Sequence, residues 1–111
     1  MTAHEILIAA KQELLTRGWA QGGVEHYATG EVCVMGALGY ALYGKALGSL
    51  MFTGVDEASE YFKQAACPHA SGVAYTVVAL WNDDPARTPE DVLDAFDRAI
   101  ALAETREAVP A

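Results

Sequence analysis

A few side chains that can act as a nucleophile, base or acid are spread singly along this sequence. The candidate nucleophile is Cys33, the candidate bases are His26 and His69, and Asn82 or Asp83 could orient a histidine. A thiol near the N-terminus of a helix has a lowered pKa because the helix dipole favours the thiolate. Together these residues would form a minimal nucleophilic site of the cysteine and histidine type.

Cys33 also has a purely structural interpretation. It stands between Val32 and Val34, and a free cysteine in such surroundings commonly packs as a small buried hydrophobe. No family-specific signature of a cysteine hydrolase surrounds it. We therefore expect a buried thiol that reacts slowly, and we keep a thiol-dependent enzyme or ligand-binding protein centred on Cys33 as the alternative function.

Metal binding is a second chemical hypothesis. Cys67 and His69 could supply two ligands, and Cys33 with His26 two more. The spacing of known zinc motifs is missing, and residues 82–84 lack the glycine and distal glutamate of a calcium-binding EF-hand loop. The sequence therefore predicts neither a metal site nor a cofactor.

The tripeptide Trp81-Asn82-Asp83 has two interpretations. It could line a ligand or partner cleft together with Trp19 and Gln21. Alternatively, Asn82 ends a helix in the left-handed conformation, Asp83 accepts backbone amides of a turn, and Trp81 fills the core. We favour the second interpretation because turn chemistry explains all three residues without a ligand.

The elements that must position these residues are helices. Thr2 and Glu5 have the spacing of a capping box, Thr88 precedes Pro89 as a helix start, and apolar residues recur at three and four residue steps. The predicted fold is an all-α bundle of four to five helices with a possible short β-hairpin near residues 24–34. Its helices are expected near residues 3–17, 33–43, 56–66, 73–81 and 89–104.

Length and composition predict one helical domain over residues 1–111, with a loose C-terminal tail from about residue 105. A chain of 111 residues with 52% hydrophobic side chains is near the size at which one core suffices. The formal charge of −8 and the scattered basic residues exclude a nucleic-acid partner. The first ten residues lack the pattern of a signal peptide, so a cytoplasmic location is expected, with both cysteines reduced.

Residues 32–55 carry a single charge, Lys45, and resemble a membrane span in that respect. Repeated glycines interrupt the run, so we predict no membrane partner and a buried helix whose glycines let another backbone approach closely. The apolar surplus of this segment predicts an exposed patch for a protein partner or a homodimer. Its members are Leu47, Leu50, Met51 and Phe52.

Four short motifs, taken together, are similar to those of a known family. They are Gly18-Trp19-x-Gln21-Gly22, Gly30-Glu31-Val32-Cys33-x-x-Gly36-Ala37-Leu38, Trp81-Asn82-Asp83 and Thr88-x-Glu90-Asp91-Val92. Over nearly the whole chain they resemble DUF6197, small domains of unknown function from actinobacteria and their phages. The resemblance implies such an origin, with the host cytoplasm as the location if a phage encodes the chain. It implies no catalytic residue and no cofactor.

These observations favour one function class over another. We expect a small non-enzymatic helical protein that acts through protein–protein interaction. The thiol-dependent enzyme or ligand-binding protein remains the alternative.

Overall fold

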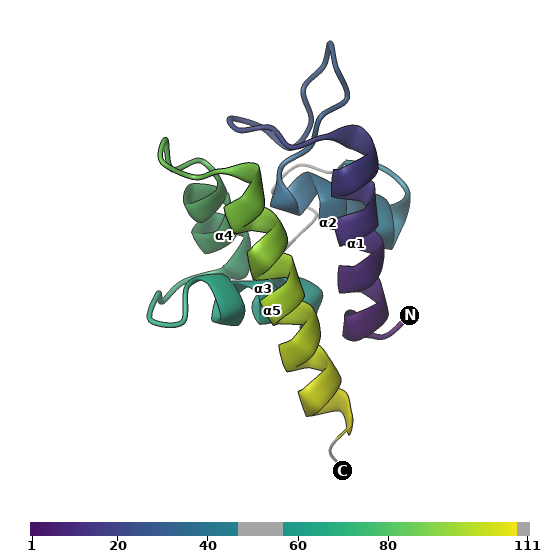
Figure 1. Ribbon diagram of the computed structural model, residues 1–111, viewed down its shortest axis with the longest axis vertical. Coiled ribbons are helices and arrows are strands. Elements are labelled where there is room, and N and C mark those ends of the chain that lie inside the picture. The colour runs from purple at the N-terminus through teal and green to yellow at the C-terminus, as the bar shows by residue number, and fades with distance from the viewer. Residues whose placement is uncertain (47–56, 109–111) are drawn as a thin grey trace.

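Five helices make up most of the described chain, which comprises residues 1–46 and 57–108 of the computed structural model (Figure 1). The all-α prediction is therefore confirmed. The helices are α1 (Ala3–Arg17), α2 (Val34–Tyr43), α3 (Glu57–Ala66), α4 (Ala74–Asn82) and α5 (Pro89–Ala108).

Local side-chain caps begin two of these helices where the sequence predicts them. At α1, Thr2 Oγ1 accepts the amide of Glu5 at 3.1 Å, and the Glu5 carboxylate accepts the amide of Thr2 at 2.9 Å. At α5, Thr88 and Asp91 exchange the same pair of bonds at 3.0 and 3.2 Å. Each cap satisfies amides that have no partner inside the helix.

Other helix boundaries differ slightly from the predicted ones. Cys33 is the residue that caps α2 and lies just outside it. The α5 helix runs to Ala108, past the predicted end at 104, and Glu107 accepts the backbone amide of His4 at 2.9 Å. This bond joins the last turn of α5 to the first turn of α1, a contact that periodicity does not reveal. The single-domain assignment stays a prediction.

The segment with mixed helix and strand preference is α4. Its Val, Tyr and Thr content favours a strand, yet it packs as a helix against α3 and α2. No strand is available in the described residues to accept its backbone hydrogen bonds, so the helical prediction is confirmed.

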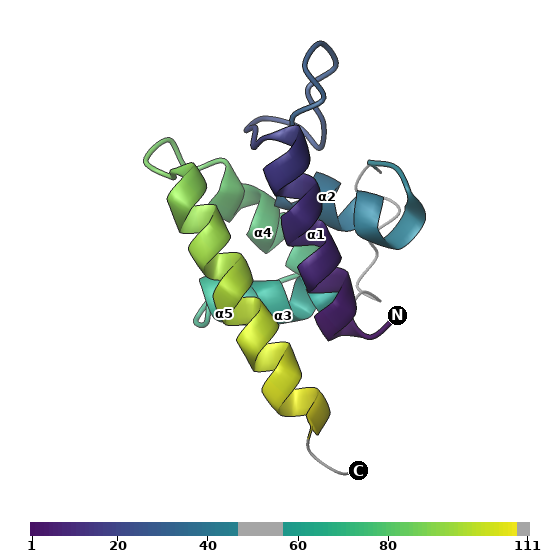
Figure 2. The same ribbon diagram turned by 45° about the vertical axis from the view of Figure 1, so that its right-hand side comes forward.

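The predicted β-hairpin is present only as isolated bridges. Val32 pairs in parallel with Trp19 and antiparallel with Glu25, and neither pairing extends into a strand within the described residues. A two-stranded ribbon is marginal without further partners. Residues 24–32 instead form a projecting loop, which rises beyond the ends of α1 and α2 (Figure 2).

The core lies between α1, α2, α3 and α5, and α4 contributes Val78 to it. Phe62 of α3 meets Phe96 of α5 edge to face, with ring centroids 4.9 Å apart, an arrangement that aromatic pairs prefer. The α1 helix packs against both α2 and α5. Several of the largest side chains in the core are fully buried: Leu7, Val32, Val34, Met35, Leu38, Phe62, Val78, Val92 and Phe96.

A glycine joins the base of the projecting loop to α2. A Cβ atom added at Gly36 would lie 1.9 Å from the carbonyl oxygen of Val24. That distance is far inside van der Waals contact, so only glycine permits the loop backbone to cross the helix here. The close backbone approach predicted from the glycines of residues 32–55 is found at this position.

Two sequence predictions concern residues 32–55. None of the described helices combines the length and apolarity that crossing a membrane requires. The predicted patch of Leu47, Leu50, Met51 and Phe52 lies outside the described residues.

Candidate functional site

Asn82, the last residue of α4, is the polar centre of the joint between α4 and α5. Its side chain is 1% exposed. The carbonyl oxygen accepts the indole N–H of Trp19 at 2.7 Å and the backbone amide of Val34 at 3.1 Å. The amide nitrogen donates to Ala20 O at 3.1 Å and to Asp83 Oδ1 at 3.0 Å. All four hydrogen-bonding positions of the Asn82 side chain are therefore used.

Gln21 and Asp83 add a second set of bonds across the same joint. Gln21 Nε2 donates to Asn82 O at 3.0 Å and to Asp84 O at 2.8 Å. Asp83 Oδ1 accepts the backbone amide of Gly22 at 3.0 Å. These bonds fasten the chain after α1 to the end of α4.

The structure thus brings the predicted cleft residues Trp19, Gln21, Asn82 and Asp83 together, but they bond mainly to one another. The expected left-handed conformation of Asn82 is wrong, because only glycines have positive φ among residues 1–46 and 57–108. Asn82 stays helical and uses its side chain for tertiary bonds.

Trp81 lies on the other side of the joint, half-buried against the core. Its ring meets Phe62 edge to face at 5.5 Å. The guanidinium of Arg87 lies 4.0 Å from the ring centroid, and Arg87 Nε donates to Trp81 O at 2.9 Å. Packing and cation–π contact account for this residue.

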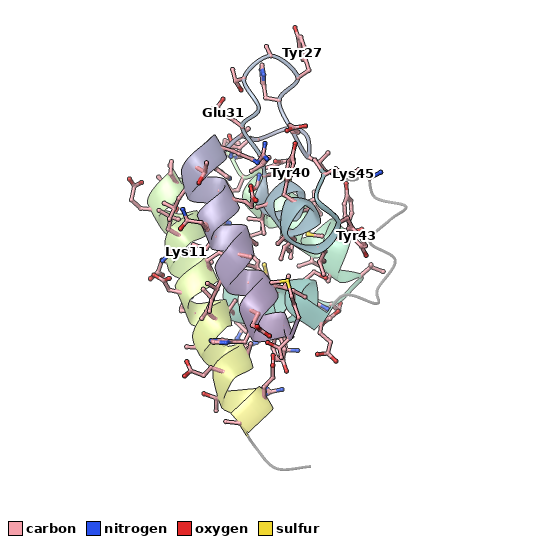
Figure 3. The ribbon with its side chains drawn as sticks, turned by 90° about the vertical axis from the view of Figure 1, so that its right-hand side faces the viewer. Lys11, Tyr27, Glu31, Tyr40, Tyr43 and Lys45 are labelled. Atoms are coloured by element: carbon pink, nitrogen blue, oxygen red, sulfur yellow. The ribbon has the colours of Figure 1, made fainter. Side chains whose placement is uncertain are left out.

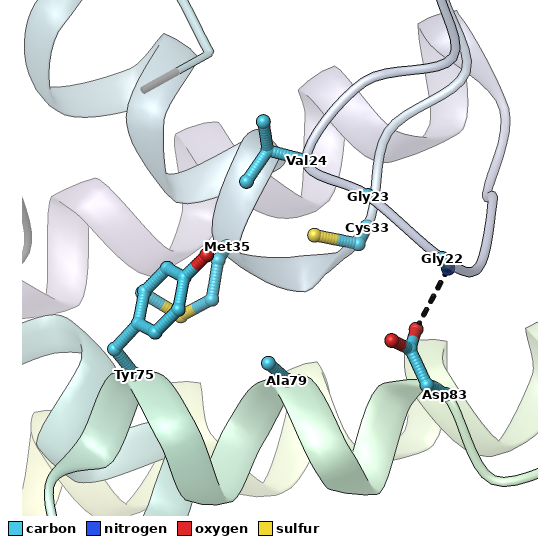
Figure 4. A pocket seen from close by; sticks show the side chains of 8 residues that line it. All are labelled: Gly22, Gly23, Val24, Cys33, Met35, Tyr75, Ala79 and Asp83. Carbon is cyan, nitrogen blue, oxygen red and sulfur yellow. Dashed lines mark hydrogen bonds between the residues drawn. The ribbon is translucent and has the colours of Figure 1, made fainter. Parts of the chain in front are cut away.

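A small cavity of about 170 Å³ lies between the base of the projecting loop, the start of α2 and α4 (Figure 4). It brings together Cys33 and Asp83, two of the residues predicted to do chemistry. Its lining consists of Gly22, Gly23, Val24, Cys33, Met35, Tyr75, Ala79 and Asp83.

Cys33 is 5% exposed, and its sulfur accepts the backbone amide of Gly36 at 3.4 Å. Burial raises the pKa of the Cys33 thiol, and the bond from Gly36 opposes this only in part. The lowered pKa on which the nucleophile hypothesis depends is therefore contradicted. The loss of solvation outweighs the favourable position at the helix N-terminus.

The two histidines lie elsewhere. His26 stacks on Tyr27 in the projecting loop, with ring centroids 5.4 Å apart, and its Nδ1 accepts the amide of Ala28 at 3.2 Å. His69 is exposed in the turn after α3. Neither lines the cavity that contains Cys33. The structure therefore does not bring the thiol, a histidine base and an orienting group together in one site.

No group of three or more histidine, cysteine, aspartate or glutamate side chains with metal-binding geometry occurs in the part of the chain that the structure describes. Cys33 is buried beside α2, whereas Cys67 is half-buried at the end of α3. The four candidate ligands considered from the sequence therefore do not form a metal cluster.

Tyr27 lies at the tip of the projecting loop and is 97% exposed (Figure 3). The loop below it is closed by backbone bonds from His26 to Glu31 O at 2.7 Å and from Gly30 to His26 O at 2.9 Å. Thr29 Oγ1 also donates to the Glu31 carboxylate at 3.0 Å. The turn residues indicated a loop, but no sequence pattern indicated that it projects.

A polar cluster anchors the other side of the loop to α1 and α2. The Arg17 guanidinium lies 3.5 Å from the centroid of the Tyr40 ring and pairs with Glu13 at 2.8 Å. The Tyr40 hydroxyl donates to Glu25 Oε2. This bond to Glu25 raises the pKa of Tyr40 above its ordinary value.

The model of a family of unknown function (DUF6197) matches residues 1–102. No curated protein and no solved structure matches the chain.

Proposed function

Because this chain belongs to the DUF6197 family, whose function is unknown, we propose its function from the geometry. It is a small non-enzymatic helical module that binds another protein, and it presents Tyr27 on the projecting loop as the central contact. The observation that carries this proposal is the 97% exposure of a large aromatic side chain on a loop held by its own hydrogen bonds.

Tyr27 has the properties of an interface anchor. Tyrosine is enriched among residues that dominate binding energy, because its ring offers a large contact area and loses little conformational freedom. The loop that carries Tyr27 is closed by its own backbone bonds, from His26 to Glu31 O and from Gly30 to His26 O. An element that is ordered in advance loses less entropy on binding. The partner should therefore offer a pocket that takes a phenol ring.

Charge pairing supports a protein partner over a nucleic acid. Several basic side chains are engaged by carboxylates of the same chain and do not form a free positive surface. These pairs are Lys11 with Asp97, Arg17 with Glu13, Arg87 with Asp84, and Arg98 with Asp94.

The competing thiol-dependent enzyme has less support. Its nucleophile would be Cys33, whose pKa is raised by burial, and its bases would be His26 and His69, which do not line the same cavity. We also propose a cytoplasmic location, in the host if a phage encodes the chain, and an actinobacterial or phage origin. Self-association through residues 47–52 remains part of the proposal.

The test compares two tyrosine variants. Tyr27→Ala should abolish capture of the partner from a lysate of the source organism while the melting temperature changes little. Tyr43→Ala is the matched control, since Tyr43 is 50% exposed but lies at the end of α2. Equal loss of capture in both variants, or full capture by Tyr27→Ala, would contradict the proposed contact.

A further inference from the structure

The cavity between the projecting loop and α4 has a charged end and an apolar end. The Asp83 carboxylate lies at one end, and Val24, Met35 and Tyr75 line the other (Figure 4). The backbone of Gly22 and Gly23 forms part of the wall between them. A ligand that fits this cavity would therefore have one polar group and one apolar body.

One of the two carboxylate oxygens of Asp83 already accepts hydrogen bonds from within the chain. Oδ1 accepts the amides of Gly22 and of the Asn82 side chain, both at 3.0 Å. Within residues 1–46 and 57–108, Oδ2 makes no hydrogen bond and Asp83 has no ion-pair partner. The adjacent Asp84, in contrast, pairs with Arg87 at 3.9 Å. Asp83 therefore keeps an acceptor oxygen available for a cation.

The Cys33 thiol, which also lines the cavity, does not supply a competing charge. Burial raises the pKa of Cys33, so its thiol is neutral at neutral pH. Among the described residues that line the cavity, Asp83 is the only one with an acidic or basic side chain. The Asp83 carboxylate in the cavity and the formal charge of −8 on the whole chain both favour a cationic ligand over an anionic one.

The volume limits the size of the apolar body. A cavity of about 150 Å³ lined by apolar side chains is known to hold benzene. The cavity here is slightly larger, at about 170 Å³. It can therefore hold a body of about one aromatic ring and a single small substituent.

From this geometry we propose that the cavity binds a small organic ammonium ion, with the ammonium on Asp83 Oδ2 and a ring-sized apolar body against Val24, Met35 and Tyr75. The site is independent of the proposed Tyr27 contact, although the loop that carries Tyr27 begins at its wall. A bound ammonium would donate a charge-assisted hydrogen bond, which is stronger than one from a neutral hydroxyl.

The experiment titrates benzylamine, which is protonated at neutral pH, and its neutral analogue benzyl alcohol, while amide NMR shifts are followed. We expect benzylamine to shift the amides of Gly22, Gly23 and Ala79. It should bind up to about fivefold more tightly than the alcohol, because an ion pair with an exposed carboxylate such as that of Asp83 is worth at most about 1 kcal/mol. Equal affinities, no binding of benzylamine, or shifts confined to other residues would overturn the proposal.

Two cavity variants and one control variant test whether the preference for benzylamine arises in this cavity. Asp83→Asn keeps an acceptor for Gly22 and removes the charge, so the preference for benzylamine should disappear. Ala79→Leu fills the cavity from α4, so binding of both probes should disappear even if Asp83→Asn does not fold. Asp94→Asn removes an exposed carboxylate of α5 and should leave the preference unchanged. A preference that survives both cavity variants would contradict the site.

Discussion

The indole N–H of Trp19 donates to the side-chain oxygen of Asn82 at 2.7 Å, across 63 residues of sequence. The same oxygen accepts the amide of Val34, which opens α2. One buried side chain therefore holds together the segment after α1, the start of α2 and the end of α4. We interpret Asn82, together with Asp83, as the tie that sets the position of the projecting loop.

Replacing Asn82 should be costly. Asn82→Ala removes all four bonds of the side chain and leaves the indole of Trp19 and the amide of Val34 without their acceptor. We expect a loss of about 2 to 4 kcal/mol in the free energy of unfolding, measured by urea denaturation. Thr76→Ala, at an exposed position of α4, should change it by less than about 0.5 kcal/mol. Similar small losses in both variants would contradict the role of Asn82.

Gly36 should tolerate no side chain. Gly36→Ala places a methyl group 1.9 Å from Val24 O, so either the loop or α2 must move, and we expect a loss of about 3 kcal/mol or more. Gly23→Ala is the matched control, because a Cβ there meets nothing within 4 Å. Thermal unfolding of both variants measures the difference. A stable Gly36→Ala protein with unchanged amide shifts around Val24 would show that the close approach is absent.

Much of the fold could be predicted from local patterns. The capping pairs at Thr2 and Thr88 and the spacing of apolar residues depend on neighbours within one or two helical turns, and these helices lie where expected. The helical structure of the α4 segment could be predicted only because the sequence offers no long partner strand for it.

The sites were harder to predict because they depend on contacts between distant segments. Nothing near Asn82 in sequence reveals that Trp19 and Val34 need its oxygen, so the local interpretation assigned it a left-handed turn. The burial of Cys33 was predicted from its apolar neighbours in the sequence and is confirmed, but only the packed structure shows that burial outweighs the helix N-terminus and raises the pKa of the thiol. The exposure of Tyr27 depends on where the loop leaves the bundle.

Cys33 should be slow to react and should make stability depend on pH. Its raised pKa means that the folded state retains the thiol proton when the unfolded state has begun to lose it, at about pH 8.5 and above. The contribution is present below that pH and is lost as pH rises through the folded pKa. We expect the stability of the native chain to fall more steeply above pH 8.5 than that of Cys33→Ser.

Thiol labelling gives a second measurement on the same residue. Cys67, which is half-buried, should react first with a thiol reagent at neutral pH, and Cys33 only on unfolding. Rapid labelling of Cys33 in the native protein, lost on mutation of His26 or His69, would instead support the thiol-dependent enzyme.

Replacing Tyr27 should affect binding but not stability. The ring is almost fully exposed and contacts mainly His26, so Tyr27→Ala should change the free energy of unfolding by less than about 0.5 kcal/mol. Calorimetric unfolding of this variant and of the parent chain provides the comparison. A larger loss would mean that the loop contributes to the fold, and that reduced binding cannot be assigned to a lost contact.

The central claim is that Tyr27 contacts a protein partner, and site-specific photo-crosslinking tests it most directly. A photoreactive phenylalanine analogue at position 27 should crosslink to one protein, either a partner or a second copy of this chain. The same analogue at the exposed α4 position 76 should not. Crosslinks from position 76 alone, or from neither position in cells that contain the full set of partners, would contradict the account.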